Sequence, residues 1–283
     1  MRMFVLLLGA GISLAAAPPA GNAPFPPYHI MGNLYSVGAA DITSFLVTTP
    51  AGHIIINSGY EDTVPIIRSG VEKLGFKMRD VKILLASHAH NDHVGGLATL
   101  KQLTGAQVMI MQGDAYEIST GGKGDFRFHN SWKPCKIDRI LHDGDEVRLG
   151  GTTLVAHLTP GHTRGNTTWT MQADDGGRKY NVVIVGSTSI NPGVVLVHNP
   201  KYPQIAEEYG RAFRTLRALP CDVFLASHAG VYDGAEKYRR LAAGEKPNPF
   251  IDPAGYKTYL DSSEQHYREQ LAAERAQAAK TAR

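Results

Sequence analysis

Three histidines and one aspartate are crowded into six residues, His88, His90, Asp92 and His93, directly after the apolar run "ILLAS". His88 and His90 are two positions apart, so in an extended backbone their side chains point to the same side and can bind one ion. Asp92 and His93 stand at or near the start of the following helix and face a second position. A solvated polar turn does not need four ligand-type side chains at this spacing. The pattern therefore predicts a metal site.

Two further histidines occupy similar places along the chain. His162 lies in "LTPGHTRGN", in a tight turn after a strand, and His228 lies at the end of the apolar run "VFLAS". The set then holds five imidazoles and one carboxylate, enough for two zinc ions with three protein ligands each and an open position on both. An open position allows zinc-bound water to ionise near neutral pH and to act as a nucleophile. We expect His157, on the strand before His162, to be packed or surface-facing rather than a ligand.

Short apolar runs separated by Gly, Asp and Asn turns must position these residues. Residues 34–59 are predicted as three strands, residues 61–76 as an amphipathic helix and "VKILLAS" as a fully apolar strand. The second half again combines strands and a helix, and its last strand, "CDVFLASHAG", repeats the Leu-Ala-Ser-His of "ILLASHAH". This order predicts an α/β fold in which two mixed β-sheets face each other with helices on the outside, one sheet from each half. His88 and His228 both fall at carboxyl ends of strands, where open sheets bind ligands.

Composition and charge limit the domain count and the partners. The chain has 283 residues, 43% hydrophobic and 19% charged, which allows a large core and fits one large domain. Lys and Arg number 29 against 26 Asp and Glu, and no basic stripe or Arg-rich run could follow a phosphate backbone. We therefore expect no nucleic acid partner. We also expect a monomer and a small-molecule substrate, which are expectations that the charge balance does not decide.

The N-terminus has the layout of a signal peptide. A positive start precedes an apolar run over residues 4–17, and small residues and prolines follow. The run is shorter than the roughly 20 residues that a membrane-spanning helix needs. A buried N-terminal helix is the alternative, but the proline-rich stretch offers no amphipathic continuation. We predict a signal peptide over residues 1–23, cut between about residues 16 and 23, export to the periplasm without stable membrane insertion, and a single domain over residues 24–283.

The chain has two cysteines, Cys135 and Cys221, 86 positions apart. Their spacing matches neither a zinc ribbon nor a redox CxxC motif. In an oxidising compartment they could form one disulfide that closes a long loop. Two buried free thiols are the alternative, and both possibilities stay open.

Three motifs carry a resemblance to a known family: HxHxDH at residues 88–93, PGHT at residues 160–163 and SHAG at residues 227–230. Together they resemble the metallo-β-lactamase superfamily, over most of the chain from about Tyr28 onward. The resemblance implies the αββα sandwich of that superfamily, which agrees with the order of strands and helices.

The residue after "VVIVG" narrows the resemblance. Glyoxalase-type and lactonase-type members carry an Asp there that bridges both metals, and two subclasses of metallo-β-lactamase carry a Cys ligand, whereas this chain has Ser187. With a second serine at position 189, the sequence is most similar to subclass B3 enzymes. Asn57 is a departure, because many relatives have an Asp there that supports the metal loops.

The resemblance implies two zinc ions, each with three protein ligands: His88, His90 and His162 for the first, and Asp92, His93 and His228 for the second. A hydroxide shared by the metals would open the β-lactam amide bond of penicillins, cephalosporins or carbapenems, which gives antibiotic resistance. His90, Asp92 and His228 are then expected to be essential for catalysis. Ser187 and Ser189 are expected to bind the carboxylate of the antibiotic.

Two other classes of function stay open. A superfamily hydrolase could act on a lactone or a thioester, although Ser187 argues against it. A periplasmic metal-binding protein would instead have closed metal sites, whereas three protein ligands per ion predict open ones.

Overall fold

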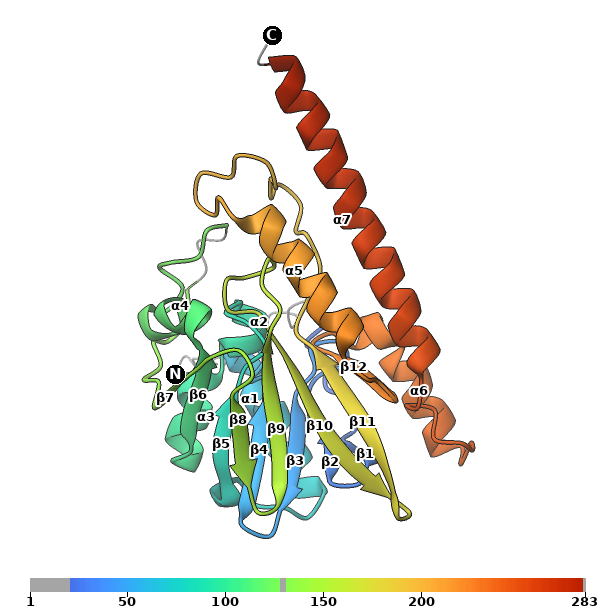
Figure 1. Ribbon diagram of the computed structural model, residues 1–283. Helices are drawn as coiled ribbons and strands as arrows, with labels where there is room; N and C mark the ends of the chain where they lie inside the picture. The colour runs from blue at the N-terminus through green and yellow to red at the C-terminus, as the bar shows by residue number, and fades with distance from the viewer. Residues whose placement is uncertain (1–20, 128–130, 282–283) are drawn as a thin grey trace, which may run out of the picture.

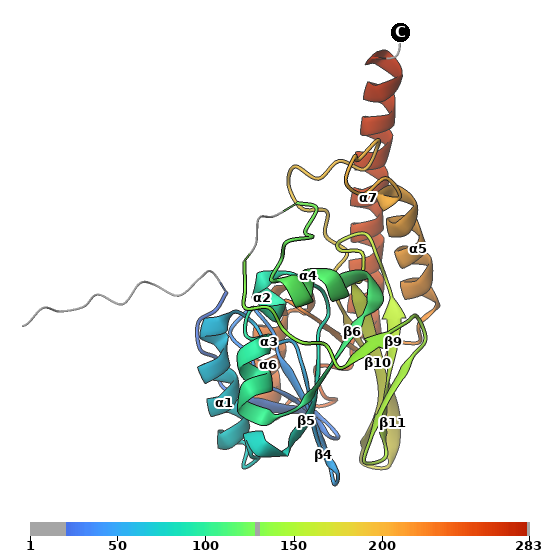
Figure 2. The ribbon, with the colours of Figure 1, turned by 90° about the vertical axis from the view of Figure 1, so that its left-hand side faces the viewer.

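The computed structural model describes residues 21–127 and 131–281, and it contains two β-sheets that face each other with helices on the outside (Figures 1 and 2). One sheet has the strand order β1-β2-β3-β4-β5-β6-β7 and the other has the order β12-β11-β10-β9-β8. Each sheet comes from one half of the chain, and the predicted α/β sandwich is confirmed.

The seven strands of the first sheet are β1 (Tyr28–Met31), β2 (Leu34–Ser36), β3 (Phe45–Thr49), β4 (Gly52–Ile56), β5 (Val81–Leu85), β6 (Gln107–Met111) and β7 (Arg139–Leu141). The five strands of the second sheet are β8 (Glu146–Leu149), β9 (Thr152–Leu158), β10 (Thr167–Asp175), β11 (Arg178–Val185) and β12 (Val223–Ala226). The helices are α1 (Val64–Lys73), α2 (Asn91–Val94), α3 (Leu97–Thr104), α4 (Ala115–Thr120), α5 (Ile205–Ala218), α6 (Gly234–Ala242) and α7 (Pro253–Thr281).

Both sheets are mixed. β1 to β4 pair antiparallel and β4 to β7 pair parallel, while in the second sheet only the β11–β12 pair is parallel. Apart from the exposed Lys82, the parallel strands β5 and β12 are apolar and buried, as strands covered on both faces must be. Their carboxyl ends lead into the loops that carry His88 and His228. In Figure 1 the strands of both sheets lie in the lower half of the molecule, below α5 and the upper part of α7.

The alternation of side chains along each strand divides the core into layers. In β4, Ile54 and Ile56 pack between the two sheets, while Ile55 packs beneath the helices outside the first sheet. Trp169 of β10 reaches across between the sheets, and its indole N–H donates to the carbonyl of Ala86 at 3.2 Å. This bond ties the second sheet to the end of β5, next to the first histidine loop.

The C-terminal helix α7 has 29 residues, and only its first part packs on the rest of the domain. It begins at Pro253 and buries four residues, Tyr256, Leu260, Tyr267 and Leu271. No described residue after Leu271 is buried, and the last turns project beyond the sandwich (Figure 1). The first two thirds of the helix therefore pack on the domain.

The two cysteines are free thiols, so the disulfide alternative is wrong. Cys135 packs in the apolar cluster outside the first sheet, whereas Cys221 packs against the cluster between the sheets. Within the described residues, no helix combines the length and apolar character that a membrane crossing requires.

The first described residues already belong to the folded domain. Gly21 accepts a backbone hydrogen bond from Asp41 at 3.0 Å, Ala23 accepts one from Ala40 at 2.8 Å, and Asn22 is 1% exposed. The predicted signal peptide over residues 1–23 lies mainly outside the described residues, apart from its last three positions.

Candidate metal centre

The first histidine loop follows β5 and turns directly into the short helix α2. His90 caps α2 and accepts the backbone N–H of His93 at 2.9 Å, while its own N–H donates to the carbonyl of His88 at 3.1 Å. The turn after α2 needs glycine, because a Cβ on Gly96 would lie 2.5 Å from a methyl group of Val64 and 2.9 Å from two carbonyl oxygens. The loop therefore presents its ligands from both sides of one tight turn.

His88, His90 and His162 form one compact group. One ligand atom from each lies within 4.8 Å of the other two, and the three rings are 4.6 to 4.8 Å apart. Burial, and the other histidines, hold the pKa of His88 and His162 well below the ordinary value, and burial is the largest cause that lowers the pKa of His90 to about 4. All three imidazoles are therefore neutral, which is the form that binds a metal.

Asp92, His93 and His228 form a second group beside the first. An oxygen of Asp92 lies 3.3 Å from Nε2 of His93 and 3.4 Å from Nε2 of His228, and the two Nε2 atoms are 3.2 Å apart. His88 also lies close enough to share a metal with Asp92 and His93. Burial opposes ionisation of Asp92, but the neighbouring His93 and His228 outweigh it and hold its pKa below the ordinary value. The structure thus brings together all six residues that the sequence predicted as ligands.

Asp41 holds His228 in place, a role that no sequence motif indicates. Its carboxylate accepts Nδ1–H of His228 at 2.8 Å and the backbone N–H of Gly230 at 2.8 Å. The hydrogen bond from His228 is the largest cause that lowers the pKa of Asp41. Nδ1 is thereby occupied, so Nε2 of His228 faces Asp92. Asp41 was missed because it lies in a loop with no motif, 187 positions from its partner.

Asp114 is a second residue that sequence reasoning missed. It is 2% exposed and accepts the backbone N–H groups of Ala89 at 2.8 Å and Gly165 at 2.6 Å and the hydroxyl of Thr163 at 2.7 Å. Burial raises the pKa of Asp114 to about 7. It joins the HxHxDH loop to the PGHT loop, so it fixes the distance between the ligands that these loops carry.

Asn57, the departure noted in the sequence, supports the start of the first histidine loop. Its side-chain oxygen accepts the backbone N–H of Ser87 at 2.8 Å. It has φ of 66°, a conformation that asparagine tolerates better than most residues, and among the described residues its buried Nδ2 has no hydrogen-bond partner. The Asn57 side chain therefore supports the loop only through its oxygen, which accepts the N–H of Ser87.

A cavity of about 380 Å³ opens onto the two groups. The residues that line it are Tyr60, His88, His90, Asn91, Asp92, His162, Ser187, Ser189, Asn191 and His228. Both serines predicted to bind substrate are thus on its wall. The Ser189 hydroxyl lies 3.0 Å from that of Ser187 and 3.2 Å from Nδ1 of His162, and the Ser189 carbonyl accepts Nδ1–H of His162 at 2.8 Å. Ser189 therefore also orients a ligand, a role that the sequence did not suggest.

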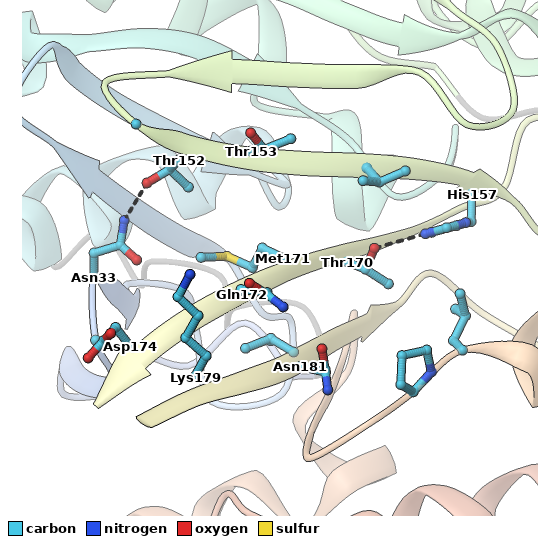
Figure 3. A pocket seen from close by; sticks show the side chains of 16 residues that line it. Asn33, Thr152, Thr153, His157, Thr170, Met171, Gln172, Asp174, Lys179 and Asn181 are labelled. Atoms are coloured by element: carbon cyan, nitrogen blue, oxygen red, sulfur yellow. Dashed lines mark hydrogen bonds between the residues drawn. The ribbon is translucent and has the colours of Figure 1, made fainter. Parts of the chain in front are cut away.

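A larger cavity, of about 840 Å³, lies away from these ligands on β9, β10 and β11 (Figure 3). Its lining includes His157, whose Nε2 lies 2.8 Å from the hydroxyl of Thr170. None of the six ligand residues lines this cavity. His157 is packed on a strand away from the metal groups, as expected. Only the smaller of these two cavities is lined by candidate metal ligands, so it is the candidate site of catalysis.

The chain is similar to known proteins in sequence and in fold. A family model described as the metallo-beta-lactamase superfamily matches residues 37–228. The native FEZ-1 metallo-beta-lactamase from Legionella gormanii is similar at 48% identity with a TM-score of 0.88, over 90% of this chain and 98% of that chain. The class B3 di-zinc metallo-beta-lactamase LRA-12 from an Alaskan soil metagenome is similar at 35% identity with a TM-score of 0.86, over 91% of this chain and 98% of that chain.

The curated relatives carry a different name. A hydroxyacylglutathione hydrolase of Rhodopseudomonas palustris strain BisB5 is 28% identical over 182 residues, which are 64% of this chain and 60% of that relative. The chain therefore matches about 60% of the length of this relative, and at lower identity than the two solved structures.

Proposed function

Because the chain belongs to the metallo-β-lactamase superfamily, we propose that it is a dizinc β-lactamase that hydrolyses the amide bond of penicillins, cephalosporins or carbapenems and so gives antibiotic resistance. The observation that carries the proposal is the meeting of five imidazoles and one carboxylate beside one open cavity, which all of them except His93 line. The similarity to two metallo-β-lactamases over nearly their whole length supports β-lactams as the substrate class and a monomer as the acting form.

The donor set fits zinc. Imidazole nitrogen and carboxylate oxygen are ordinary zinc ligands, and three ligands per ion leave a position for substrate. We assign His88, His90 and His162 to the first ion and Asp92, His93 and His228 to the second. When bound, the ions would supply Lewis acidity and the lowered pKa of water that hydrolysis near neutral pH requires.

The residues behind the ligands fix which nitrogen faces the cavity. The Ser189 carbonyl accepts Nδ1–H of His162, and Asp41 accepts Nδ1–H of His228, so each imidazole presents Nε2 to its group. Tyr209 donates its hydroxyl to the same Ser189 carbonyl at 2.7 Å, which holds that carbonyl in place. These contacts organise the ligands before any metal or substrate binds, and so reduce the cost of reorganisation.

The wall formed by Ser187, Ser189 and Asn191 offers hydrogen-bond donors to a substrate carboxylate. The Ser189 hydroxyl already lies near both His162 and Ser187. The Ser187 hydroxyl accepts the backbone N–H of Ser189 at 3.2 Å, which leaves its O–H to donate to the Ser189 hydroxyl or to the substrate. In this proposal Ser187 is therefore the serine that binds the carboxylate, and Ser189 contributes mainly through His162.

Export to the periplasm belongs to the same proposal, since β-lactams act outside the cytoplasm. We place the signal-peptide cut before Gly21, within the range of about residues 16 to 23, so that the mature domain begins a few residues earlier than residue 24. The carbonyls of Gly21 and Ala23 hold the loop of Asp41, and a cut after residue 23 would remove both of these contacts. Mass spectrometry of the exported protein tests this position.

The proposed activity is tested by hydrolysis of a carbapenem and a penicillin by purified protein, with and without a chelator, next to a lactone and a glutathione thioester. We expect turnover of at least one β-lactam and its loss on chelation. The thioester is the second candidate substrate, because the curated relatives are named hydroxyacylglutathione hydrolases. Turnover of the thioester or lactone alone would replace the β-lactam assignment.

A further inference from the structure

The cavity wall that carries the serines belongs to a long connection without regular secondary structure. Residues 186–204 join β11 to α5, and Ser187, Ser189 and Asn191 of this connection line the cavity. Asn191 accepts the backbone N–H of Val194 at 3.0 Å, so its position depends on the part of the connection that follows. Something outside the connection must hold that part in place.

The C-terminal helix α7 makes this contact through one carboxylate. Oε2 of Glu274 accepts the backbone N–H groups of Leu196 at 2.6 Å and Val197 at 2.8 Å. Gln270, one turn earlier, donates to the carbonyl of Val194 at 2.9 Å and to Oε1 of Glu274 at 2.8 Å. Bonds from two backbone N–H groups to one charged oxygen are stronger than neutral hydrogen bonds. Figure 2 shows the connection reaching toward α7 above α5.

Apolar packing accompanies these bonds. Val194 and Leu196 are buried in one cluster with Tyr267 and Leu271 of α7 and with Tyr209 of α5. Tyr209 also donates its hydroxyl to the Ser189 carbonyl, so the cluster is continuous with the residue that orients His162. The contacts therefore run from the far part of α7 to the cavity wall.

We propose that Glu274 is a positioning residue for substrate binding: from α7 it anchors residues 194–197, and through them it sets the position of Asn191 and the serine wall of the cavity. The inference takes its substrate class, β-lactams, from the proposed function. The contact itself consists of the Glu274 carboxylate and the backbone N–H groups of Leu196 and Val197 and does not depend on that function. The part of α7 after Leu271 contributes no buried residue to the core. Its role in this proposal is to hold, through Glu274, the connection that forms the cavity wall.

The test compares Glu274→Ala and Glu274→Gln with Glu269→Ala, a matched control. Glu269 lies on the same helix, and its carboxylate accepts a hydrogen bond from the exposed side chain of Gln265. In Glu274→Ala we expect KM for a β-lactam to rise about fivefold, with kcat and zinc content nearly unchanged, because contacts made equally in the ground and transition states are weakened. Glu274→Gln keeps an acceptor oxygen and should recover most of the affinity. Glu269→Ala should match the parent.

Amide hydrogen exchange tests the contact between Glu274 and the connection independently of the hydrolytic activity. The amides of Leu196 and Val197 should exchange faster in Glu274→Ala than in the parent and the Glu269→Ala control. Unchanged exchange, unchanged KM, or a loss of kcat and zinc in step with thermal stability would each overturn the inference. A parent that hydrolyses no β-lactam would instead end the proposed function, and amide exchange would still decide whether Glu274 anchors the connection.

Discussion

Two strands end in the same tetrapeptide, Leu-Ala-Ser-His, yet their histidines enter the cavity in different ways. His88 follows β5, is 2% exposed, and has Nδ1 3.1 Å from the hydroxyl of its neighbour Ser87. His228 follows β12, has a side chain that is 36% exposed, and donates Nδ1–H to Asp41. The first histidine is held by packing and a local hydroxyl, and the second by a carboxylate from another part of the chain.

The different surroundings of His88 and His228 shift the pKa values of their imidazoles in opposite directions. Burial and the neighbouring histidines drive the pKa of His88 down. Burial acts in the same direction on His228, but the hydrogen bonds and charges of Asp41 and Asp92 outweigh it and raise the pKa to about 9. Identical local sequence therefore gives opposite electrostatics, because each strand end faces a different loop.

The largest effects are expected from removing one ligand of each group. His90→Ala and His228→Ala should each lower kcat/KM for a β-lactam by more than about a hundredfold, beyond the loss expected for an outer partner. Each variant should also bind one zinc ion less than the parent, while the circular dichroism spectrum stays the same. A variant of either kind with full turnover would contradict the ligand assignment.

The carboxylate behind His228 comes next. Asp41→Asn keeps the shape and an acceptor oxygen but removes the charge, so we expect a loss of about 10- to 100-fold in affinity for the second zinc ion or in activity. Competition with a chelator, followed by counting the zinc retained, measures it. Equal retention of both ions in Asp41→Asn and the parent would mean that the carboxylate does not support His228.

The hydroxyl behind His88 should matter less. Ser87→Ala removes a neutral partner from a histidine that packing already holds, so we expect a loss of activity of less than about tenfold. The same hydrolysis assay, run beside Asp41→Asn, gives the ratio of the two effects. If Ser87→Ala were the more damaging change, the contrast between a packed and a carboxylate-held histidine would be wrong.

The smallest effect on activity is expected at Asn57, where the change is mainly in stability. Asn57→Ala leaves the buried N–H of Ser87 without its acceptor and places alanine at φ of 66°, which should lower the free energy of unfolding by about 1–3 kcal/mol. The midpoint of urea denaturation with bound zinc measures the loss. An unchanged midpoint would show that water or a rearranged loop replaces the asparagine oxygen.

Sequence patterns were sufficient for the sandwich and for the residues that meet in the cavity. Strand periodicity gave the two sheets, and all six predicted ligands lie together because each follows a strand or opens the next helix at the same edge. The supporting residues could not be predicted. Asp41, Asp114 and Glu274 act through contacts between distant segments, so nothing in their local sequence distinguishes them from the other acidic residues of the chain.

The two-metal proposal is tested most directly by adding zinc back to protein stripped with a chelator while following hydrolysis of a carbapenem. We predict no turnover without metal and a rate that rises until about two zinc ions are bound per chain. Full turnover in the stripped protein, or no β-lactam hydrolysis by protein that holds two zinc ions, would contradict it.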